Sequence, residues 1–331
     1  MKALERKLHS ITHGTYTPDD FIIADAKDAD MAFGVQAPAP APGDISAEGT
    51  RPRYRTRAQY LEHMAEEVRA GAVDIMLTSA SNGERLANDA LFKGSDVTLA
   101  VRGNDSSDIW NPRGGTYPTH PSRPFRTVSL ERVREYCSLV LYSVTFNNDL
   151  DHDLATLEAY AEFRDEAHNV GMRHFLEVFN PNAPVDLAPN DIGPFVNDQI
   201  IRLLAGVTLA ERPLFLKIVF NGTESLTELV QHDPTLVVGI LGGSAGTTRD
   251  TLELLSQGEK AGARVSLFGR KVQRAESQLD LLAVMRSVVT GKLTPEQGVA
   301  SYHDTLRSKG IQPERSLEQD QHITESVLAI G

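Results

Sequence analysis

Short apolar segments alternate with longer segments of helical periodicity along most of the chain. Eight of the short segments are rich in Val, Ile, Leu and Phe and end at Gly, Asn, Asp or Pro, which is typical of strands buried on both faces. The predicted strands are Phe21–Lys27, Val73–Ser79, Val97–Asn104, Leu139–Phe146, His174–Phe179, Leu214–Phe220, Val237–Gly243 and Arg264–Gly269.

The segments between these strands place apolar residues three and four positions apart and then stop at glycine, as amphipathic helices do. The predicted helices are Thr56–Gly71, Leu150–Gly171, Asp191–Gly206, Thr247–Gly262 and Ala275–Gly291. Because strand and helix alternate around eight strands, the pattern predicts a parallel sheet closed as a (β/α)8 TIM barrel.

Three segments fall outside this alternation. Val35–Arg53 holds alternating Ala and Pro and predicts a stiff surface loop, with part of a lid as the alternative. Asn104–Thr127 follows the third strand, so in a barrel it lies on the catalytic face, and we expect it to cover a substrate. Thr294–Lys309 predicts an extra C-terminal helix. We therefore expect residues 1–331 to form one barrel domain, with a core of about 20–290 and a helical extension at 292–331.

Composition narrows the range of partners and locations. The 331 residues carry a net charge of -12, which argues against nucleic acid or an anionic membrane as a partner. The single cysteine, Cys137, allows no internal disulfide and fits a reducing compartment. No apolar run reaches about 18 residues, and the N-terminus lacks the apolar stretch of a secretory signal. We therefore expect a cytoplasmic protein.

Lys217 lies in the middle of the apolar segment Leu214–Phe220. Alternation along a strand puts it on one face with Phe215 and Val219, which in a barrel is expected to face the interior. Poor solvation there favours a neutral amine, which can attack a carbonyl carbon and form an imine. The structural alternative is a lysine paired with a buried carboxylate or reaching the mouth of the barrel.

Other predicted strands also carry one polar side chain in an apolar run. Asp25, Tyr142 and Glu177 are expected to converge with Lys217, because barrel active sites are built at the ends of several strands. Each also has a structural interpretation: a loop cap, a core tyrosine, or a counter-charge to Lys217. Lys27 is expected either to lower the pKa of Lys217 or to bind substrate, and Arg102 to bind substrate.

The last two strands end in turns that suit an anion. Gly242, Gly243 and Ser244 end one strand and open a helix, and Gly269 and Arg270 end the next. Small residues let backbone N–H groups approach a ligand, and phosphate sites in barrels commonly come from these two loops. Two ordinary tight turns are the alternative. The ten histidines show no metal-binding spacing, so we expect neither a metal site nor a cofactor.

These residues resemble the DeoC/LacD/DhnA group of class I (Schiff-base) aldolases, nearest the tagatose-bisphosphate aldolase branch. The resemblance rests on four segments within residues 20–290: Phe21–Asp25, Phe175–Glu177, Leu216–Ile218 and Gly269–Arg274. It implies a Schiff-base lysine at Lys217, an aspartate at Asp25 that assists carbinolamine chemistry, and a phosphate held at Gly269 and Arg270. It also implies that the protein is a homo-oligomer.

The predicted function is a metal-independent class I aldolase. It would cleave or form a carbon–carbon bond of a phosphorylated or anionic ketose or keto acid through Lys217, with Tyr142 or Glu177 moving the proton. Two alternatives stay open: a transaldolase-like synthase that uses the same lysine, and an inactive barrel that binds a sugar phosphate.

Overall fold

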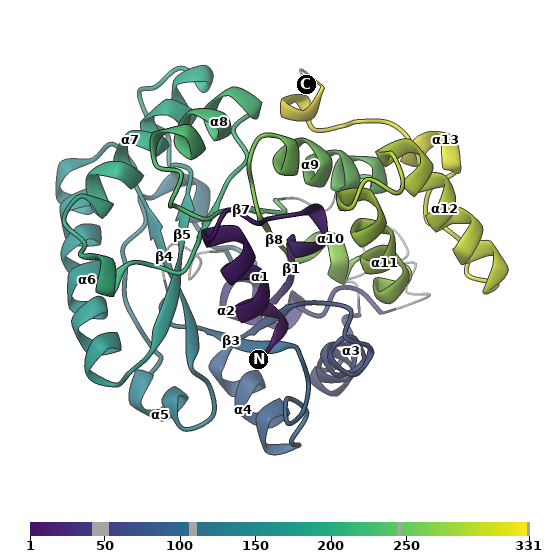
Figure 1. The fold of residues 1–331 in the computed structure, drawn as a ribbon, viewed down its shortest axis with the longest axis horizontal. Helices are drawn as coiled ribbons and strands as arrows, with labels where there is room; N and C mark the ends of the chain where they lie inside the picture. The colour runs from purple at the N-terminus through teal and green to yellow at the C-terminus, as the bar shows by residue number, and fades with distance from the viewer. Residues whose placement is uncertain (42–52, 106–110, 244–245, 330–331) are drawn as a thin grey trace.

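Eight parallel strands close into a barrel in the computed structural model, which describes residues 1–41, 53–105, 111–243 and 246–329 (Figure 1). Each strand pairs with its neighbours in the chain, and β8 pairs with β1. The predicted (β/α)8 barrel and all eight predicted strands are confirmed. The strands are β1 Ile22–Lys27, β2 Ile75–Thr78, β3 Thr98–Arg102, β4 Leu139–Thr145, β5 Arg173–Phe179, β6 Leu216–Ile218, β7 Val238–Leu241 and β8 Val265–Phe268.

Helices cover the outside of the barrel. The predicted helices appear as α3 Arg57–Ala70, α6 Leu150–Asn169, α7 Ile192–Leu204, α9 Thr248–Lys260, α11 Gln278–Val289 and α12 Pro295–Ser308. Helices that the periodicity did not predict are α1 Ala3–Thr12, α2 Asp30–Phe33, α4 Ala80–Asn88, α5 Leu130–Arg134, α8 Thr223–His232, α10 Arg270–Gln273 and α13 Leu317–Asp320. Thr56 caps α3 as the sequence suggests, because its side chain accepts a hydrogen bond from the Gln59 backbone.

Two separate apolar clusters define the inside and the outside of the strands. One joins alternate residues of the strands, among them Ala24, Leu141 and Phe215, and fills the barrel. The other joins the intervening residues to the helices, and it includes Leu216 and Ile218. Side chains that alternate with the first cluster therefore face the helices, and those in step with it face the barrel interior.

Helix α1 closes the end of the barrel at which the strands begin (Figure 1). Leu4 is fully buried in the interior cluster, and Leu8 and Ile11 pack against it. Lys7 fixes the helix at this end, since its Nζ donates to the backbone oxygen of Phe21 and to the carboxylate of Asp74. The other end of the barrel, where the strands stop, is not covered by α1 and leaves room for a functional site.

The predicted C-terminal extension packs beside the barrel wall. α12 contacts α9 and α11, and α13 follows it (Figure 1). The long loop after β3 is also confirmed, and its described ends pair through an antiparallel bridge between Asp105 and Phe125. Within the described residues, no helix is both long and apolar enough to cross a membrane.

The described part of Val35–Arg53 differs from the surface loop predicted there. Ala37 and Ala39 are buried, and the backbone of Pro40 pairs with that of Tyr54. Gln273 of α10 holds this segment, because its side-chain amide donates to the backbone oxygen of Pro38. Residues 36–40 thus form part of the wall beside the end of the barrel at which the strands stop.

Candidate active site

Lys217 faces the barrel interior, as the alternation along β6 predicts. Its strand neighbours Leu216 and Ile218 belong to the outer cluster, and Lys217 itself is only 6% exposed. The Nζ atom lies 2.5 Å from Oε1 of Glu177, which is its direct neighbour across the β5–β6 ladder. The strand register therefore places an amine and a carboxylate in contact in a nearly closed environment.

A polar chain continues from this pair across the barrel. Ser143 Oγ donates to Oε2 of Glu177 at 2.7 Å, and Arg102 Nη2 donates to Ser143 Oγ at 3.3 Å. Arg102 Nη1 in turn lies 3.1 Å from Oδ2 of Asp28. All of these side chains are buried. Both oxygens of Glu177 are thus held, which fixes the carboxylate facing Lys217.

Asn104 sets the position of the central members of this chain. The residue pairs between β3 and β4 involve only Val101 and Arg102 of β3. Beyond Arg102, the side chain of Asn104 makes the hydrogen bonds to β4. Its side chain donates to the Ser143 backbone oxygen at 2.8 Å and accepts from the Ser143 backbone nitrogen at 2.7 Å. Its backbone oxygen accepts from Arg102 Nε at 3.0 Å. Asn104 therefore replaces missing ladder hydrogen bonds and orients two side chains of the site.

Lys217 opens onto a cavity of about 240 Å³ at the end of the barrel where the strands stop, here called the main cavity. Its charged described residues are three cations and two carboxylates, whereas the whole chain has a net charge of -12. A local excess of positive charge in a cleft favours an anionic ligand. The main cavity is lined by Ala26, Asp28, Ala29, Ala32, Phe33, Arg102, Asn111, Tyr117, Glu177, Phe179, Lys217, Leu241, Gly242, Gly243, Leu267, Gly269 and Arg270.

The glycines predicted to hold an anion line this cavity, together with Arg270. A Cβ on Gly269 would lie 2.5 Å from the backbone oxygen of Ala26, so the close approach of β8 to β1 requires glycine there. The guanidinium of Arg270 lies over the Phe33 ring, 5.6 Å from its centre. Gly242 and Gly243, which follow the neighbouring strand β7, also line the cavity, and Ser244 lies outside the described residues.

Asp25 and Lys27 do not join the site, so the expected convergence of these strand residues is wrong for β1. Ala24 and Ala26 face the interior, which turns Asp25 and Lys27 towards α3. Lys27 Nζ lies 2.5 Å from Asp25 and 3.3 Å from Glu67 of α3. Burial alone would lower the pKa of Lys27, but these two carboxylates outweigh burial and raise it. Lys27 therefore cannot act on Lys217 as expected.

Tyr142 also faces away from Lys217. Its ring packs 4.2 Å from Phe163 and 5.2 Å from Tyr160, both on α6, measured between ring centres. Burial raises the pKa of Tyr142. Of the two proton carriers predicted, only Glu177 lies beside the amine, because Tyr142 shares the outward face of β4 with Val140 and Val144.

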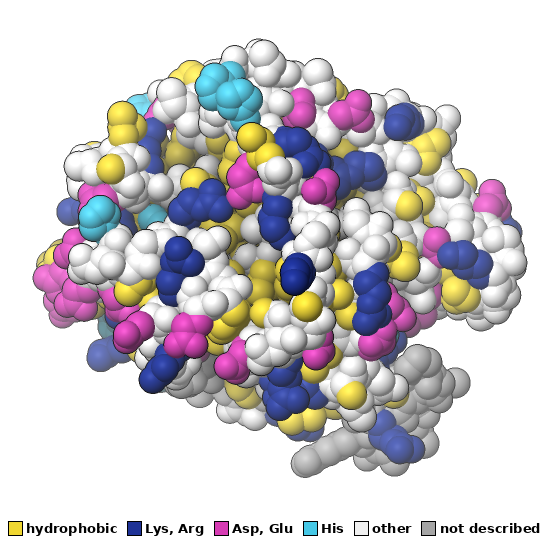
Figure 2. All heavy atoms as spheres, turned by 60° about the horizontal axis from the view of Figure 1, so that its bottom comes forward, with side chains coloured by type: hydrophobic (Ala, Val, Ile, Leu, Met, Phe, Trp, Pro, Cys, Tyr) yellow, Lys and Arg dark blue, Asp and Glu magenta, His cyan; other side chains and the backbone are white. Residues whose placement is uncertain are grey.

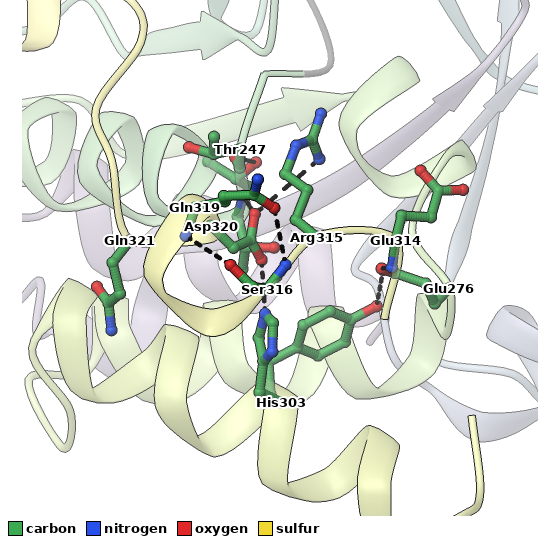
Figure 3. Close-up of polar contacts among 12 residues, drawn as sticks. Thr247, Glu276, His303, Glu314, Arg315, Ser316, Gln319, Asp320 and Gln321 are labelled. Carbon is green, nitrogen blue, oxygen red and sulfur yellow. Dashed lines mark hydrogen bonds and ion pairs between the residues drawn. The ribbon is translucent and has the colours of Figure 1, made fainter. Parts of the chain in front are cut away.

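The N-terminus of α9 is occupied by the chain's own carboxylates, contrary to the expectation that it favours an external anion. Asp250 accepts from the Thr247 backbone nitrogen at 2.9 Å, and Asp320 of α13 accepts from the Thr248 backbone nitrogen at 2.8 Å. Figure 3 shows Asp320 between Thr247 and His303, with Arg315 beside it. The backbone nitrogens of Thr247 and Thr248 are therefore not free for a ligand, and an anion site at Gly242 and Gly243 stays a prediction.

Asp28 and Ser143 escaped the sequence analysis, whereas Asn104 and Tyr117 lie within the segment Asn104–Thr127 that it expects to cover a substrate. Asp28 carried a usable signal, because it continues the alternation of Ala24 and Ala26 on the interior face of β1. Tyr117 comes from the long loop after β3, which Asn182 ties down by donating to the backbone oxygens of Tyr117 and His120 at 2.7 Å. Among the described residues, no cluster of His, Cys, Asp and Glu is suited to hold a metal ion.

Comparison of sequences gives no relative. No family model matches the chain, and no curated protein matches its sequence.

Comparison of structures gives the folds of fructose-bisphosphate aldolases. An archaeal fructose 1,6-bisphosphate aldolase is 17% identical with a TM-score of 0.59, and the match covers 86% of this chain and 99% of that one. An archaeal fructose-1,6-bisphosphate aldolase whose catalytic lysine is covalently bound to the carbinolamine intermediate is 17% identical, with a TM-score of 0.60 and coverage of 86% and 100%.

A third neighbour has the highest TM-score of the three. The fructose-bisphosphate aldolase from Slackia heliotrinireducens is 16% identical with a TM-score of 0.61, and the match covers 92% of this chain and 90% of that one. The predicted nearness to tagatose-bisphosphate aldolases stays a prediction, since these three neighbours are fructose-bisphosphate aldolases. At these identities the likeness establishes that this chain has the fold on which those aldolases are built.

Proposed function

We propose that the protein is a class I aldolase that works through a Schiff base on Lys217. The observation that carries the proposal is the contact between Lys217 Nζ and Glu177 Oε1 at 2.5 Å, inside the barrel and at the wall of the main cavity. A buried amine needs a partner that removes its proton before it can attack a carbonyl. The fold that this chain shares with fructose-bisphosphate aldolases supports the same reaction class.

Glu177 takes the proton that Lys217 must lose, and Nζ then attacks the carbonyl carbon of the substrate. Glu177 returns a proton to the carbinolamine oxygen, which leaves as water and creates the iminium ion. Glu177, again a carboxylate, accepts the proton of the hydroxyl two carbons away. The carbon–carbon bond then breaks, the hydroxyl carbon becomes the carbonyl of the released fragment, and the electron pair moves into the iminium to form an enamine. The iminium serves as the electron sink, so the proposed reaction requires no metal.

The substrate is proposed to be a phosphorylated or otherwise anionic ketose or keto acid. Arg102 and Arg270 supply positive charge on two walls of the main cavity, and the backbone at Gly242, Gly243 and Gly269 approaches the same space. Arg102 is fixed by Asp28 and Ser143, so its role is to set the field around Lys217. Arg270, from the turn after β8, lines the same cavity and is proposed to bind the anionic end of the substrate.

Borohydride trapping tests the proposal. Incubation with dihydroxyacetone phosphate and sodium borohydride is expected to add one reduced adduct to the peptide that contains Lys217, measured by mass spectrometry. Pre-treatment with EDTA should leave the adduct yield unchanged, because the lysine and not a metal activates the carbonyl.

Two variants accompany the trapping experiment. Lys217→Met should abolish the adduct, whereas Lys27→Met, which removes a buried lysine outside the barrel, should retain it if folded. Glu177→Gln should slow adduct formation by about 10²-fold or more, as expected for loss of a positioned acid–base group. Trapping at other lysines with none at Lys217, for every carbonyl compound tried, would overturn the proposal and leave a ligand-binding barrel.

A further inference from the structure

A second cavity of about 150 Å³ lies beside the main cavity, and we call it the side cavity. The two cavities share one wall, which consists of Ala26, Ala29, Phe33, Gly269 and Arg270. The remaining described walls are Gln36, Ala37, Ala39, Pro40, Tyr54, Tyr60, Gln273 and Arg274. A single water molecule needs about 10–15 Å³. The side cavity therefore has room for a group as large as a phosphate.

The charged side chains on the described walls of the side cavity are all positive. Arg270 and Arg274 line it, and neither Asp nor Glu is among its described residues. The main cavity differs, because the carboxylates of Asp28 and Glu177 accompany the cations there. The whole chain, with a net charge of -12, has the opposite sign. A cleft lined by charge of one sign concentrates ions of the other sign, so the side cavity favours an anion.

Arg274 has no contact that balances its charge. Among the described residues, its guanidinium forms no hydrogen bond and no ion pair. Its backbone nitrogen donates to the Arg270 backbone oxygen at 3.1 Å, so the two arginines lie one helical turn apart at the end of α10. Like charges at this spacing destabilise a helix. An anion in the side cavity would offset this repulsion and accept charge-assisted hydrogen bonds from both groups.

Gln36 adds a neutral donor to the same walls. Its side-chain oxygen accepts from the Tyr54 hydroxyl at 3.1 Å, which leaves the amide nitrogen of Gln36 to donate to a ligand. Gln273 has a structural role instead, because its amide nitrogen donates to the Pro38 backbone oxygen at 2.9 Å. The side cavity therefore combines two cationic donors with one neutral donor.

We propose that the side cavity binds a phosphate-type dianion, held by the guanidinium groups of Arg270 and Arg274 and by the amide of Gln36. This site differs from the anion position proposed in the main cavity, because Arg274 and Gln36 do not line the main cavity. The dianion is either a free phosphate ion or a second phosphate group of a substrate bound at Lys217. Only the second case rests on the proposed aldolase function.

Titration of the full chain with inorganic phosphate tests the site without any reaction. Isothermal titration calorimetry at low ionic strength should show saturable binding that weakens as salt is added. Arg274→Gln removes one guanidinium and should weaken this binding about tenfold or more, the typical effect of losing a hydrogen bond to a charged group. Arg274 is exposed, so the variant is expected to fold.

Three further variants locate the bound ion. Ala37→Leu narrows the side cavity alone and should abolish the binding, whereas Ala32→Leu, in a wall of the main cavity alone, should retain it. Arg315→Gln is the matched control for Arg274→Gln. Arg315 is also exposed and lines a different cavity together with Arg274, but it does not line the side cavity. Its substitution should change the phosphate affinity by less than about twofold.

Two sugar phosphates identify the source of the dianion. If the substrate supplies it, Arg274→Gln should slow borohydride trapping of fructose 1,6-bisphosphate at Lys217 by about tenfold or more, and trapping of fructose 1-phosphate by less than about twofold. If the dianion is a free ion, the variant should change the trapping of both sugars by the same factor.

Absence of saturable phosphate binding to the wild-type chain would overturn the inference. Binding that Arg274→Gln leaves unchanged would also overturn it, as would equal weakening by Arg274→Gln and Arg315→Gln, which would place the ion in the other cavity. Circular dichroism checks that each variant is folded, and Arg274→Gln decides if Ala37→Leu is not. Phosphate binding that depends on Arg274, without any adduct at Lys217, would instead refute the proposed aldolase function alone.

Discussion

At the residue scale, Glu67 of α3 occupies an unusual charge environment where this helix packs against β1. It shares the single ammonium of Lys27 with Asp25, and all three side chains are at most 1% exposed. Burial and then the negative charge of Asp25 raise the pKa of Glu67 well above its ordinary value of 4.5. The raised pKa favours the protonated form of Glu67 in the folded state.

This charge state predicts a pH-dependent effect of Glu67→Gln. In the folded protein Glu67 holds its proton at pH values above 4.5, at which the unfolded chain has released it. The wild-type free energy of unfolding therefore loses a contribution as pH rises above 4.5 towards the folded pKa. Glutamine mimics the neutral carboxyl group, so the variant should lack this fall. Urea unfolding at pH 5, 6 and 7 measures it.

Lys27→Met tests the cation of the same cluster. It leaves Asp25 buried without its cation and should lower the free energy of unfolding by about 3–5 kcal/mol. A Glu67→Gln variant whose stability follows the wild-type pH profile in parallel would contradict the protonated state, since the variant has no group to titrate at that position.

At the scale of elements, the sequence predicts the positions of the strands more accurately than it predicts which face of each strand points into the barrel. All eight strands were found because each is a compact apolar run. Lys217 was placed correctly in the interior, but Asp25 and Tyr142 were expected in the same site and face the helices instead. In a barrel strand both faces are apolar, so alternation tells which residues share a face and not which face is inside.

Contacts distant in sequence were also beyond prediction. The turn after β7 was expected to bind an anion through the N-terminus of α9. Asp320 lies 72 residues from Thr248 and fills that position in the folded chain. Likewise, the Arg102–Asp28 ion pair joins β3 to the end of β1, which only the closed barrel brings together. Local patterns fix elements, whereas these contacts follow from how the elements assemble.

The Asp320 contact makes α13 a stabilising element for α9. Asp320 caps the Thr248 N–H and pairs with His303 Nε2 at 2.9 Å, and it is 4% exposed. Asp320→Ala leaves both groups without this partner and should lower the free energy of unfolding by about 2–3 kcal/mol. Urea unfolding measures the loss. Glu318→Ala, an exposed acidic residue of the same helix, should change it by less than about 0.5 kcal/mol. Equal effects would contradict the cap.

On the scale of the whole molecule, the two ends of the barrel have different tasks. Charged side chains of both signs are interspersed over the face drawn in Figure 2, with apolar side chains between them. The main cavity, at the end where the strands stop, holds three cations and two carboxylates among its described residues. The opposite end is closed by α1, whose Leu4 completes the interior cluster. Active sites of barrels lie at the first end, and residues at the second serve stability.

Leu4→Ala tests this division. Leu4 is fully buried among strand residues that include Ile22, so its truncation should lower the free energy of unfolding by about 2–5 kcal/mol. Leu8→Ala, in the same helix but partly exposed, should cost less. Borohydride trapping at Lys217, measured well below the unfolding transition, should match wild type in both variants. Reduced trapping by folded Leu4→Ala would contradict this division. It would show that a change in packing at the closed end alters the position of the Lys217 amine through the interior layers of side chains.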